Sequence, residues 1–327
     1  MAGFIASFAN PLNYIGGASF NPDQDLPDLS GKVFLVTGGN AGLGRETILQ
    51  LAKHHPSKIF MGARSKSKAA QAIQFIKSSI PNNVEIIWLP LELTSMKSIQ
   101  DAAEIVNTQS QRLDVLVLNA GVMSLPPGET EMGHEIQLGT NHTGHFLLCK
   151  LLLPIMLRTA ENVASDVRVV SLSSVGHNLA PSFDTLLDQD KLKKVNTNAR
   201  YGASKAANIL FAAELSRRYP SITSVSVHPG IILTDLYDSL NQRSAIIALG
   251  SKSLRFFGSS ISEGALNQLW ASAGARKDEL VNGGYYIPVG HLKPHNKYTQ
   301  NREMGQRLWE WTESELRRCG LSYITEC

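Results

Sequence analysis

Short apolar runs alternate with helix-forming segments along most of the chain, and this alternation constrains the fold more than any other feature. Runs rich in Val, Ile, Leu and Phe occur at 32–37, 59–61, 84–89, 115–118, 167–172, 222–228 and 284–288. Segments with helical periodicity separate or follow them, at 43–54, 66–79, 95–109, in a long stretch ending near 158, around 201, at 263–272 and at 302–318. Continuously apolar strands separated by helices indicate a parallel sheet covered on both faces. We therefore predict a single α/β domain built on a doubly wound parallel sheet of about seven strands.

The composition is that of an ordinary globular protein. Of the 327 residues, 43% are hydrophobic and 18% are charged, and the formal net charge is only +3. The basic residues are scattered, so there is no electrostatic reason to expect a nucleic acid as partner. The three cysteines are widely spaced and odd in number, which favours a reducing, cytoplasmic location. Neither the cysteines nor the histidines show a metal-ligand spacing, and no metal is expected.

The chain divides into three stretches by its patterns. Residues 1–30 form an N-terminal extension, 31–234 the predicted dinucleotide-binding and catalytic core, and 235–327 a substrate loop and the C-terminal part of the same domain. Residues 1–20 lack a basic n-region and are too short to span a bilayer, but packing on the body and weak membrane-surface contact both stay open. We expect residues 21–28 to be an extended polar linker. A monomer and a homodimer are equally compatible with the sequence.

Glycines follow the first predicted strand directly, at Gly38, Gly42 and Gly44. Such glycines let the backbone turn tightly and approach a pyrophosphate, which the following helix N-terminus stabilises. The spacing G-x-x-x-G-x-G differs from the usual G-x-G-x-x-G fingerprint, and a purely structural turn gives the same letters. The strand before the turn and the helix after it favour a Rossmann-type dinucleotide site.

The end of the second strand bears on which nicotinamide cofactor fits. An acidic residue there would bind the ribose 2′-hydroxyl and repel a 2′-phosphate. This chain has Arg64 and Ser65 instead, and Arg45 or Lys66 could add positive charge. Such groups bind phosphate well. The sequence therefore predicts NADP(H) rather than NAD(H).

Tyr201 and Lys205 are four residues apart in a predicted helix, so both lie on one helix face. A tyrosine hydroxyl ordinarily titrates near pH ~10, and a neighbouring ammonium favours the phenolate. The pair is therefore suited to proton transfer near neutral pH. A solvated helix face would show the same two residues, and the pair gains its meaning from the motifs around it.

Five motifs in this order closely resemble the short-chain dehydrogenase/reductase family: Thr37-Gly-Gly-Asn-Ala-Gly-Leu-Gly44, Asn119-Ala120-Gly121, Ser174, Tyr201-x-x-x-Lys205 and Pro229-Gly230. The resemblance covers about 31–234. Asn141-His142-Thr143-Gly144-His145 and the long interval between Ser174 and Tyr201 are more narrowly similar to the retinol-dehydrogenase-like branch, including its fungal members.

The resemblance implies a set of cofactor contacts. The residues expected around the cofactor phosphates are Gly38, Asn40, Gly42, Leu43 and Gly44. Those expected along the rest of the cofactor are Arg64, Glu92, Asn119, Ala120, Gly121, Tyr201, Lys205, Pro229, Gly230 and Thr234. Glu92 stands where the family usually has Asp near the adenine, and Leu118 stands where the family more often has a second asparagine.

The resemblance also implies a catalytic tetrad of Asn141, Ser174, Tyr201 and Lys205. Tyr201 would donate the proton, Lys205 would support the phenolate and hold the nicotinamide ribose, Ser174 would orient the substrate oxygen, and Asn141 would anchor a water. The expected activity is NADPH-dependent interconversion of a carbonyl and an alcohol. An epimerase or dehydratase on the same scaffold, and a non-catalytic NADP(H)-binding regulator, are the alternatives.

The substrate loop after residue 234 is rich in Ile, Leu and Phe and carries few charges near its centre. In a doubly wound fold this segment lies near the carboxyl ends of the strands, where ligands bind. Burial against such side chains favours an apolar compound, whereas a carboxylate would require a cationic partner. We therefore expect a bulky, largely apolar carbonyl or alcohol as the substrate.

Overall fold

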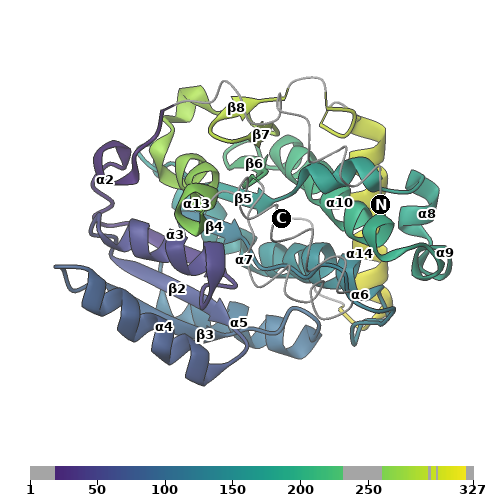
Figure 1. Ribbon diagram of the computed structural model, residues 1–327, viewed down its shortest axis with the longest axis horizontal. Coiled ribbons are helices and arrows are strands. Elements are labelled where there is room, and N and C mark those ends of the chain that lie inside the picture. Colours follow the sequence, from purple (N-terminus) through teal and green to yellow (C-terminus); the bar gives the residue numbers. More distant parts are fainter. Residues whose placement is uncertain (1–18, 231–259, 294–295, 300, 322–327) are drawn as a thin grey trace.

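A computed structural model of the chain describes residues 19–230, 260–293, 296–299 and 301–321. Within these residues, eight strands form one sheet in the order β3-β2-β1-β4-β5-β6-β7-β8 (Figure 1). The strands are β1 Val33–Thr37, β2 Lys58–Ala63, β3 Glu85–Pro90, β4 Val115–Leu118, β5 Arg168–Leu172, β6 Thr223–Val227, β7 Tyr285–Ile287 and β8 His291–Leu292. All neighbouring strands are parallel except β7 and β8. The predicted doubly wound sheet is confirmed, with β8 as an additional antiparallel edge.

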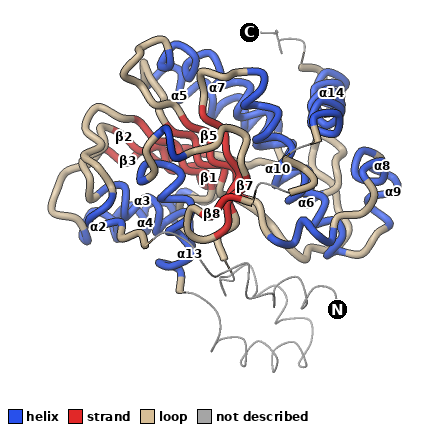
Figure 2. Tube along the Cα trace, turned by 90° about the horizontal axis from the view of Figure 1, so that it is seen from above, coloured by secondary structure: helices blue, strands red, loops and turns tan. Residues whose placement is uncertain are grey.

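Helices cover both faces of the sheet (Figure 2). One face carries α3 Gly42–Ala52, α4 Lys66–Ser79 and α13 Ile261–Leu269. The other face carries α5 Met96–Gln109, α7 Gly144–Ala160 and α10 Thr197–Arg218, with α14 Arg302–Arg318 packed beside α10. The shorter segments are α2 Pro22–Asp25, α6 Ile136–Leu138, α8 Phe183–Leu187 and α9 Gln189–Lys194, the π-helical η2 Gly139–Thr143 and η4 Trp270–Gly274, and the 3-10 segments η3 Val175–Leu179 and η5 Lys277–Glu279.

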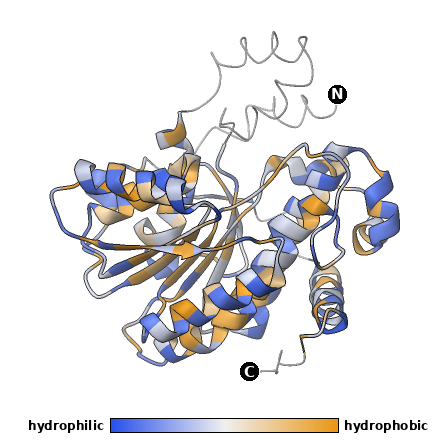
Figure 3. Cartoon of the chain, turned by 90° about the horizontal axis from the view of Figure 1, so that it is seen from below, coloured by the Kyte–Doolittle hydropathy of each residue, from blue (hydrophilic) through white to orange (hydrophobic). Residues whose placement is uncertain are grey.

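The core is divided in two because successive side chains of a strand point to opposite faces. In β1, Phe34 and Val36 pack with Ile48 of α3, while Leu35 packs with the helices of the other face. Figure 3 shows the apolar colour concentrated on the strands and on the helix faces turned toward them. Full burial of one such side chain stabilises the fold by roughly 1.5–3 kcal/mol.

The C-terminal helix α14 contributes aromatic side chains to the core. Trp309 is buried, and its ring stacks on Phe211 at 6.0 Å and meets Phe146 edge-on at 4.7 Å. Trp311 is only partly buried and lies 5.7 Å from the ring of His134. The contacts of Trp309 join α14 to α7 and α10, and they thereby support α10, the helix that carries Tyr201.

The expectation of an extended linker at 21–28 is wrong. Asn21 caps a single helical turn by accepting a hydrogen bond from the Asp23 amide, and Pro22 occupies the first helical position, where a missing N–H costs nothing. Leu26 and Leu29 are then buried against the body. Most of the predicted substrate loop, 231–259, lies outside the described residues. No helix in the described part of the chain is long and apolar enough to cross a bilayer.

Candidate active site

The site lies where the strand order reverses, between β1 and β4, at the carboxyl ends of the strands. A cavity of about 370 Å³ opens there. The predicted site residues in its wall are Gly38, Asn40, Gly42, Leu43, Arg64, Glu92, Asn119, Ala120, Gly121, Tyr201, Lys205 and Pro229. Gly44, Asn141, Ser174 and Gly230 lie behind or beside this wall, and Thr234 falls outside the described residues. One cavity thus brings together residues that are far apart in the sequence.

The Gly-rich turn after β1 requires glycine for steric reasons. Gly38 has a φ of +67°, which residues with a side chain rarely adopt. A Cβ on Gly38 would lie only 3.1 Å from the side-chain Nδ2 of Asn119. A Cβ on Gly44 would collide with the carbonyl oxygen of Gly38. Ala41 begins α3 without any side-chain cap, so the helix presents uncapped N–H groups beside the cavity. This arrangement is suited to an anion such as a pyrophosphate.

Asn119 holds the Gly-rich turn against β4. Its Nδ2 donates to the Thr37 carbonyl at 2.8 Å, and its Oδ1 accepts from Gln268 of α13 at 3.3 Å. Gln268 also donates to Thr47 of α3. No local pattern in the sequence indicates this role for Gln268, because its partners lie 149 and 221 residues away along the chain.

Tyr201 and Lys205 both line the cavity from α10, as their spacing predicts. The Lys205 Nζ lies 5.7 Å from the centre of the Tyr201 ring and donates to the Leu172 carbonyl at 2.9 Å. Burial lowers the pKa of Lys205 to about 8. The ammonium is therefore charged at neutral pH but titrates much closer to it than an exposed lysine does.

Asn141 is buried behind the cavity in the π-helical segment η2, where the helix preceding α7 widens. Its Oδ1 accepts from the Val122 amide at 2.7 Å, and its Nδ2 donates to the Val122 carbonyl at 2.9 Å and to Ser204 at 2.9 Å. A Cβ on Gly121 would lie 3.3 Å from Asn141 Oδ1 and 3.6 Å from Lys205 Nζ. The side-chain amide of Asn141 and the ammonium of Lys205 therefore both lie beside Gly121.

Ser174 begins η3, and its hydroxyl accepts from the Gly176 amide at 3.1 Å. A Cβ on Gly176 would lie 2.9 Å from the Tyr201 ring and 3.4 Å from Ser174 Oγ, so Gly176 allows close packing beside both. The neighbouring Ser173 lines the cavity instead, and its hydroxyl donates to the Lys205 carbonyl at 2.7 Å.

His177 supports the backbone of Ser174. Because a carbonyl oxygen only accepts, the 2.6 Å contact assigns a proton to His177 Nδ1, which donates to the Ser174 carbonyl. The Nε2 then accepts from Asn296 at 3.1 Å. Burial lowers the pKa of His177 to about 4, which keeps the ring neutral.

His145 joins Asn141 to the first βα turn. Its Nδ1 donates to the Asn141 carbonyl at 3.0 Å, so its Nε2 accepts from the Thr37 hydroxyl at 2.8 Å. Thr37 Oγ1 in turn accepts from the Ala120 amide at 2.9 Å. Burial lowers the pKa of His145 to about 4, so this chain of hydrogen bonds is uncharged.

A second, shallower hollow adjoins the cavity and is lined by Asn40, Arg64, Ser65 and Lys68. Arg64 is 73% exposed and makes a long ion pair with Glu92, at 3.5 Å.

The two other cations that the sequence analysis considered point elsewhere. Lys66 lies over the Trp88 ring at 5.8 Å, and Arg45 lies over the Phe75 ring at 4.8 Å. Lys68, which the sequence analysis did not consider, lines the hollow in their place.

Comparison with known proteins agrees with this geometry. A family model described as short chain dehydrogenase matches residues 32–183. The short-chain dehydrogenase/reductase drtF of Aspergillus calidoustus is 37% identical over an alignment that covers 90% of this chain and 96% of that protein. The chain belongs to the short-chain dehydrogenase/reductase family.

Further relatives confirm the predicted branch of short-chain dehydrogenases/reductases. Retinol dehydrogenase 12 of Mus musculus is 32% identical, with 86% of this chain and 85% of that protein covered. The crystal structure of an uncharacterized protein from Mycobacterium Paratuberculosis shares the fold with a TM-score of 0.69 at 26% identity, covering 92% of this chain and 98% of that one. Membership of this short-chain dehydrogenase/reductase branch supports an enzyme of the oxidoreductase class.

Proposed function

We propose that this short-chain dehydrogenase/reductase uses NADP(H) to interconvert a carbonyl and an alcohol on a bulky, apolar substrate. The observation that carries the proposal is the convergence of Tyr201 and Lys205 on a cavity that also contains the Gly-rich turn. A proton donor, a buried cation and a phosphate-binding turn in one cavity are what carbonyl reduction with a nicotinamide cofactor requires.

The residues around the cavity fit an NADP molecule. The uncapped N-terminus of α3 and the close approach allowed at Gly38 suit the pyrophosphate. The hollow with Arg64, Ser65 and Lys68 suits a 2′-phosphate, since its side chains are cationic or hydroxyl-bearing. Glu92 is the acidic exception at the hollow's border, and its ion pair with Arg64 is long enough to yield to a phosphate.

Tyr201 would donate its hydroxyl proton to the oxygen of the reduced carbonyl. When bound, the nicotinamide would supply the hydride in this direction and accept it in the other. The positive charge of Lys205 would stabilise the phenolate that remains on Tyr201. Asn141 holds the backbone at Val122, and Ser174, which like Tyr201 packs beside Gly176, would orient the substrate oxygen.

The substrate end of the cavity is apolar. Val122, Leu125 and Ile136 line it together with Tyr201. Burying an apolar substrate against these side chains would gain about 25 cal/mol per Å² of apolar surface removed from water. Among the described residues at this end of the cavity, Lys205 supplies the positive charge, so a charged acid would have to compete for it or stay unpaired there.

The test measures NADPH oxidation by absorbance with decalone, cyclohexanone, pyruvate and glucose, in the wild type and in Tyr201→Phe. We expect the fastest turnover with decalone and a loss of at least ~10²-fold in Tyr201→Phe, because a general acid is removed. The NADPH dissociation constant of the variant should stay within about twofold of the wild type.

Four outcomes would contradict the proposal. Near-normal turnover in Tyr201→Phe would refute the assigned proton donor. NADPH binding without consumption would favour a regulator, and conversion of substrate with the cofactor unchanged would favour an epimerase or dehydratase. Faster turnover of pyruvate or glucose than of decalone would refute the apolar substrate class.

A further inference from the structure

A buried ion pair lies directly beside the candidate proton donor. Arg200 precedes Tyr201 in α10, and its Nη1 lies 2.9 Å from the Glu135 carboxylate. The two residues are 2% and 0% exposed. Desolvating two charges costs so much that an apolar pair of similar size is often at least as stable. Stability alone is therefore a poor reason for this pair, and the groups that it contacts suggest another.

The guanidinium of Arg200 holds the loop that follows β4. Its Nη2 donates to the Leu125 carbonyl at 3.0 Å, and its Nη1 also donates to the Pro126 carbonyl at 3.4 Å. Thr197, one turn earlier in α10, donates its hydroxyl to the same Leu125 carbonyl at 3.0 Å. The first turn of the helix carrying Tyr201 is thus fixed to this loop.

The carboxylate of Glu135 holds the start of α6. Its second oxygen accepts from the Gln137 amide at 3.0 Å and from the Leu138 amide at 2.8 Å. The side chain of Gln137 then accepts from the Ser124 amide at 2.9 Å and donates to the Thr197 carbonyl at 3.0 Å. Ser124 has a φ of +57°, which is uncommon for a residue other than glycine and persists where neighbours hold it.

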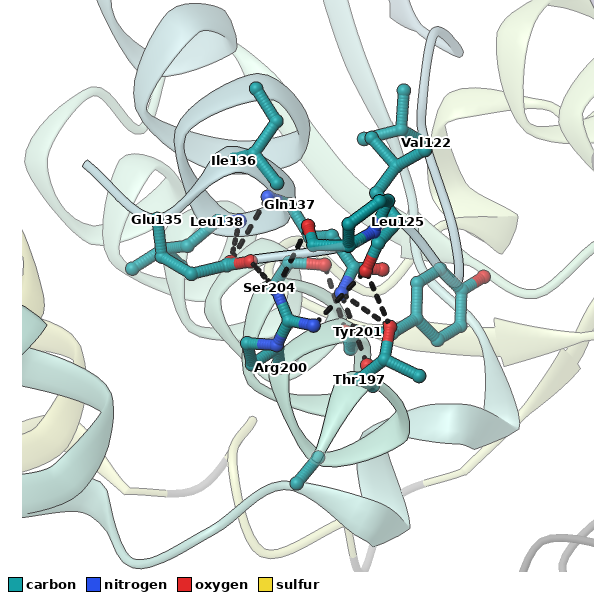
Figure 4. A network of polar contacts seen from close by, with 12 residues as sticks. Val122, Leu125, Glu135, Ile136, Gln137, Leu138, Thr197, Arg200, Tyr201 and Ser204 are labelled. Atoms are coloured by element: carbon teal, nitrogen blue, oxygen red, sulfur yellow. Dashed lines mark hydrogen bonds and ion pairs between the residues drawn. The ribbon is translucent and has the colours of Figure 1, made fainter. Parts of the chain in front are cut away.

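The backbones held in this way carry the apolar wall of the cavity. Leu125 lies in the clamped loop, and Ile136 lies between Glu135 and Gln137. Figure 4 shows Val122 and Leu125 on the side of the network where the Tyr201 ring lies. We propose that Arg200 and Glu135 are positioning residues that fix Leu125 and Ile136, two residues of the substrate wall, relative to Tyr201. This inference rests on the proposed function, because it assigns that wall to substrate.

The test replaces both charges, in Arg200→Met/Glu135→Leu, because removal of one would leave the other buried and unpaired. We expect the ratio of kcat/KM for decalone to kcat/KM for cyclohexanone to fall about tenfold, since only the larger ketone needs the whole wall. The NADPH dissociation constant should stay within about twofold, because neither Arg200 nor Glu135 lines the cavity.

Amide hydrogen exchange gives a second readout that needs no turnover. The amides of 124–125 and 136–138 should exchange at least about tenfold faster in the double variant, with those of β1 and β4 unchanged. The matched control is Lys150→Met/Glu313→Leu, which removes another shielded ion pair, 3.0 Å long, between α7 and α14. Neither control residue lines the cavity, and we expect neither the ratio nor the loop exchange to change.

The proposal is overturned if the double variant matches the control in either the substrate ratio or the loop exchange. If the double variant does not fold, Thr197→Val takes its place, because it removes the hydroxyl that donates to the Leu125 carbonyl and accepts from the Gln137 side chain while nearly keeping the side chain's shape. A smaller shift of both readouts, about threefold, is then expected, and no shift refutes the positioning role of the pair. A wild type that oxidises no NADPH with either ketone refutes the proposed function instead. The pair is then judged by loop exchange and by the dissociation constant of decalone.

Discussion

Burial sets the charge of the residues around Tyr201. Desolvation penalises the charged form of any group, so it lowers the pKa of Lys205 to about 8 and those of His145 and His177 to about 4. At neutral pH the lysine is therefore charged and both histidines are neutral hydrogen-bonding groups. Among these three, only Lys205 changes its charge between pH 7 and 9.

Loss of the Lys205 charge should weaken NADPH binding above pH 8. A lysine is charged below its pKa, so the ammonium is present at pH 7 and about nine-tenths lost at pH 9. Measured in Tyr201→Phe, where the phenol cannot titrate, the NADPH dissociation constant should rise severalfold between these two pH values. Fluorescence titration of NADPH across the pH range gives the midpoint directly.

The matched variant for this titration is Tyr201→Phe/Lys205→Met. It should bind NADPH more weakly than Tyr201→Phe at pH 7 and show a flat profile up to pH 9. An equal pH dependence in both variants would assign the titration to another group and refute the role of Lys205 in holding the cofactor.

At the residue scale, sequence could predict what depends on local spacing. Four residues place Tyr201 and Lys205 on one helix face, and both line the cavity. Sequence could not predict hydrogen bonds between residues far apart along the chain, such as those of Asn296 with His177 and of Gln268 with Asn119. Such contacts depend on how elements pack, which no local pattern records. The role of Arg200 could not be predicted for the same reason, since its partner Glu135 lies 65 residues away, just before α6.

At the element scale, the first turn of α4 forms one side of the phosphate hollow. Ser65 caps this helix by accepting from the Lys68 amide at 3.4 Å, and the first turn contains no acidic residue. The helix dipole and Lys68 therefore both favour an anion at this point. Arg64 comes from the end of β2 and completes the hollow.

Arg64→Asp should reverse or abolish the preference for NADPH. The substitution places a carboxylate beside the position expected for the 2′-phosphate, where it repels the phosphate and can instead accept from a ribose 2′-hydroxyl. The measurement is kcat/KM for NADPH and for NADH with one ketone. A wild type that uses both cofactors equally, or a variant that still prefers NADPH, would contradict the assignment.

Two lysines of the same helical turn serve as controls for each other. Lys68→Met should weaken NADPH binding without affecting NADH, because Lys68 lines the hollow. Lys66→Met should change the binding of neither cofactor, because the Lys66 ammonium lies over the Trp88 ring. An equal effect of both substitutions would indicate a general loss of positive charge rather than a specific site.

The elements that sequence predicted well are those with a strong period. The boundaries of α4 and α14 match the expected ranges, because their apolar faces repeat every three or four residues. The π-helical segment at Asn141 could not be predicted, since the bonds of the Asn141 side chain reach Val122 in the loop after β4, and no local pattern records such a contact. The short helix α2 was missed because Asn, Pro and Asp serve equally well in turns and at helix starts.

At the scale of the whole molecule, the site belongs to no single segment. Residues from Gly38 to Pro229 line the cavity, and they come from six different strands and the turns that follow them and from α3, α6, η2 and α10. Sequence predicted this meeting point, because the carboxyl ends of parallel strands share one edge of the sheet. The cavity therefore exists only in the folded chain, and a ligand that fits it binds the native state and not the unfolded state.

NADPH should accordingly stabilise the whole fold. A ligand that binds only the native state adds about 2.7 kcal/mol at a concentration 100 times its dissociation constant, which is roughly 5 °C in Tm for a large domain. We expect NADPH to give this shift in a thermal scan and NADH at the same concentration to give much less. In Arg64→Asp the order of the two cofactors should reverse, because the charge at the hollow is reversed. A wild-type Tm that neither cofactor changes would mean that the cavity does not hold a nicotinamide dinucleotide, since linkage allows no tight binding to the native state without stabilisation.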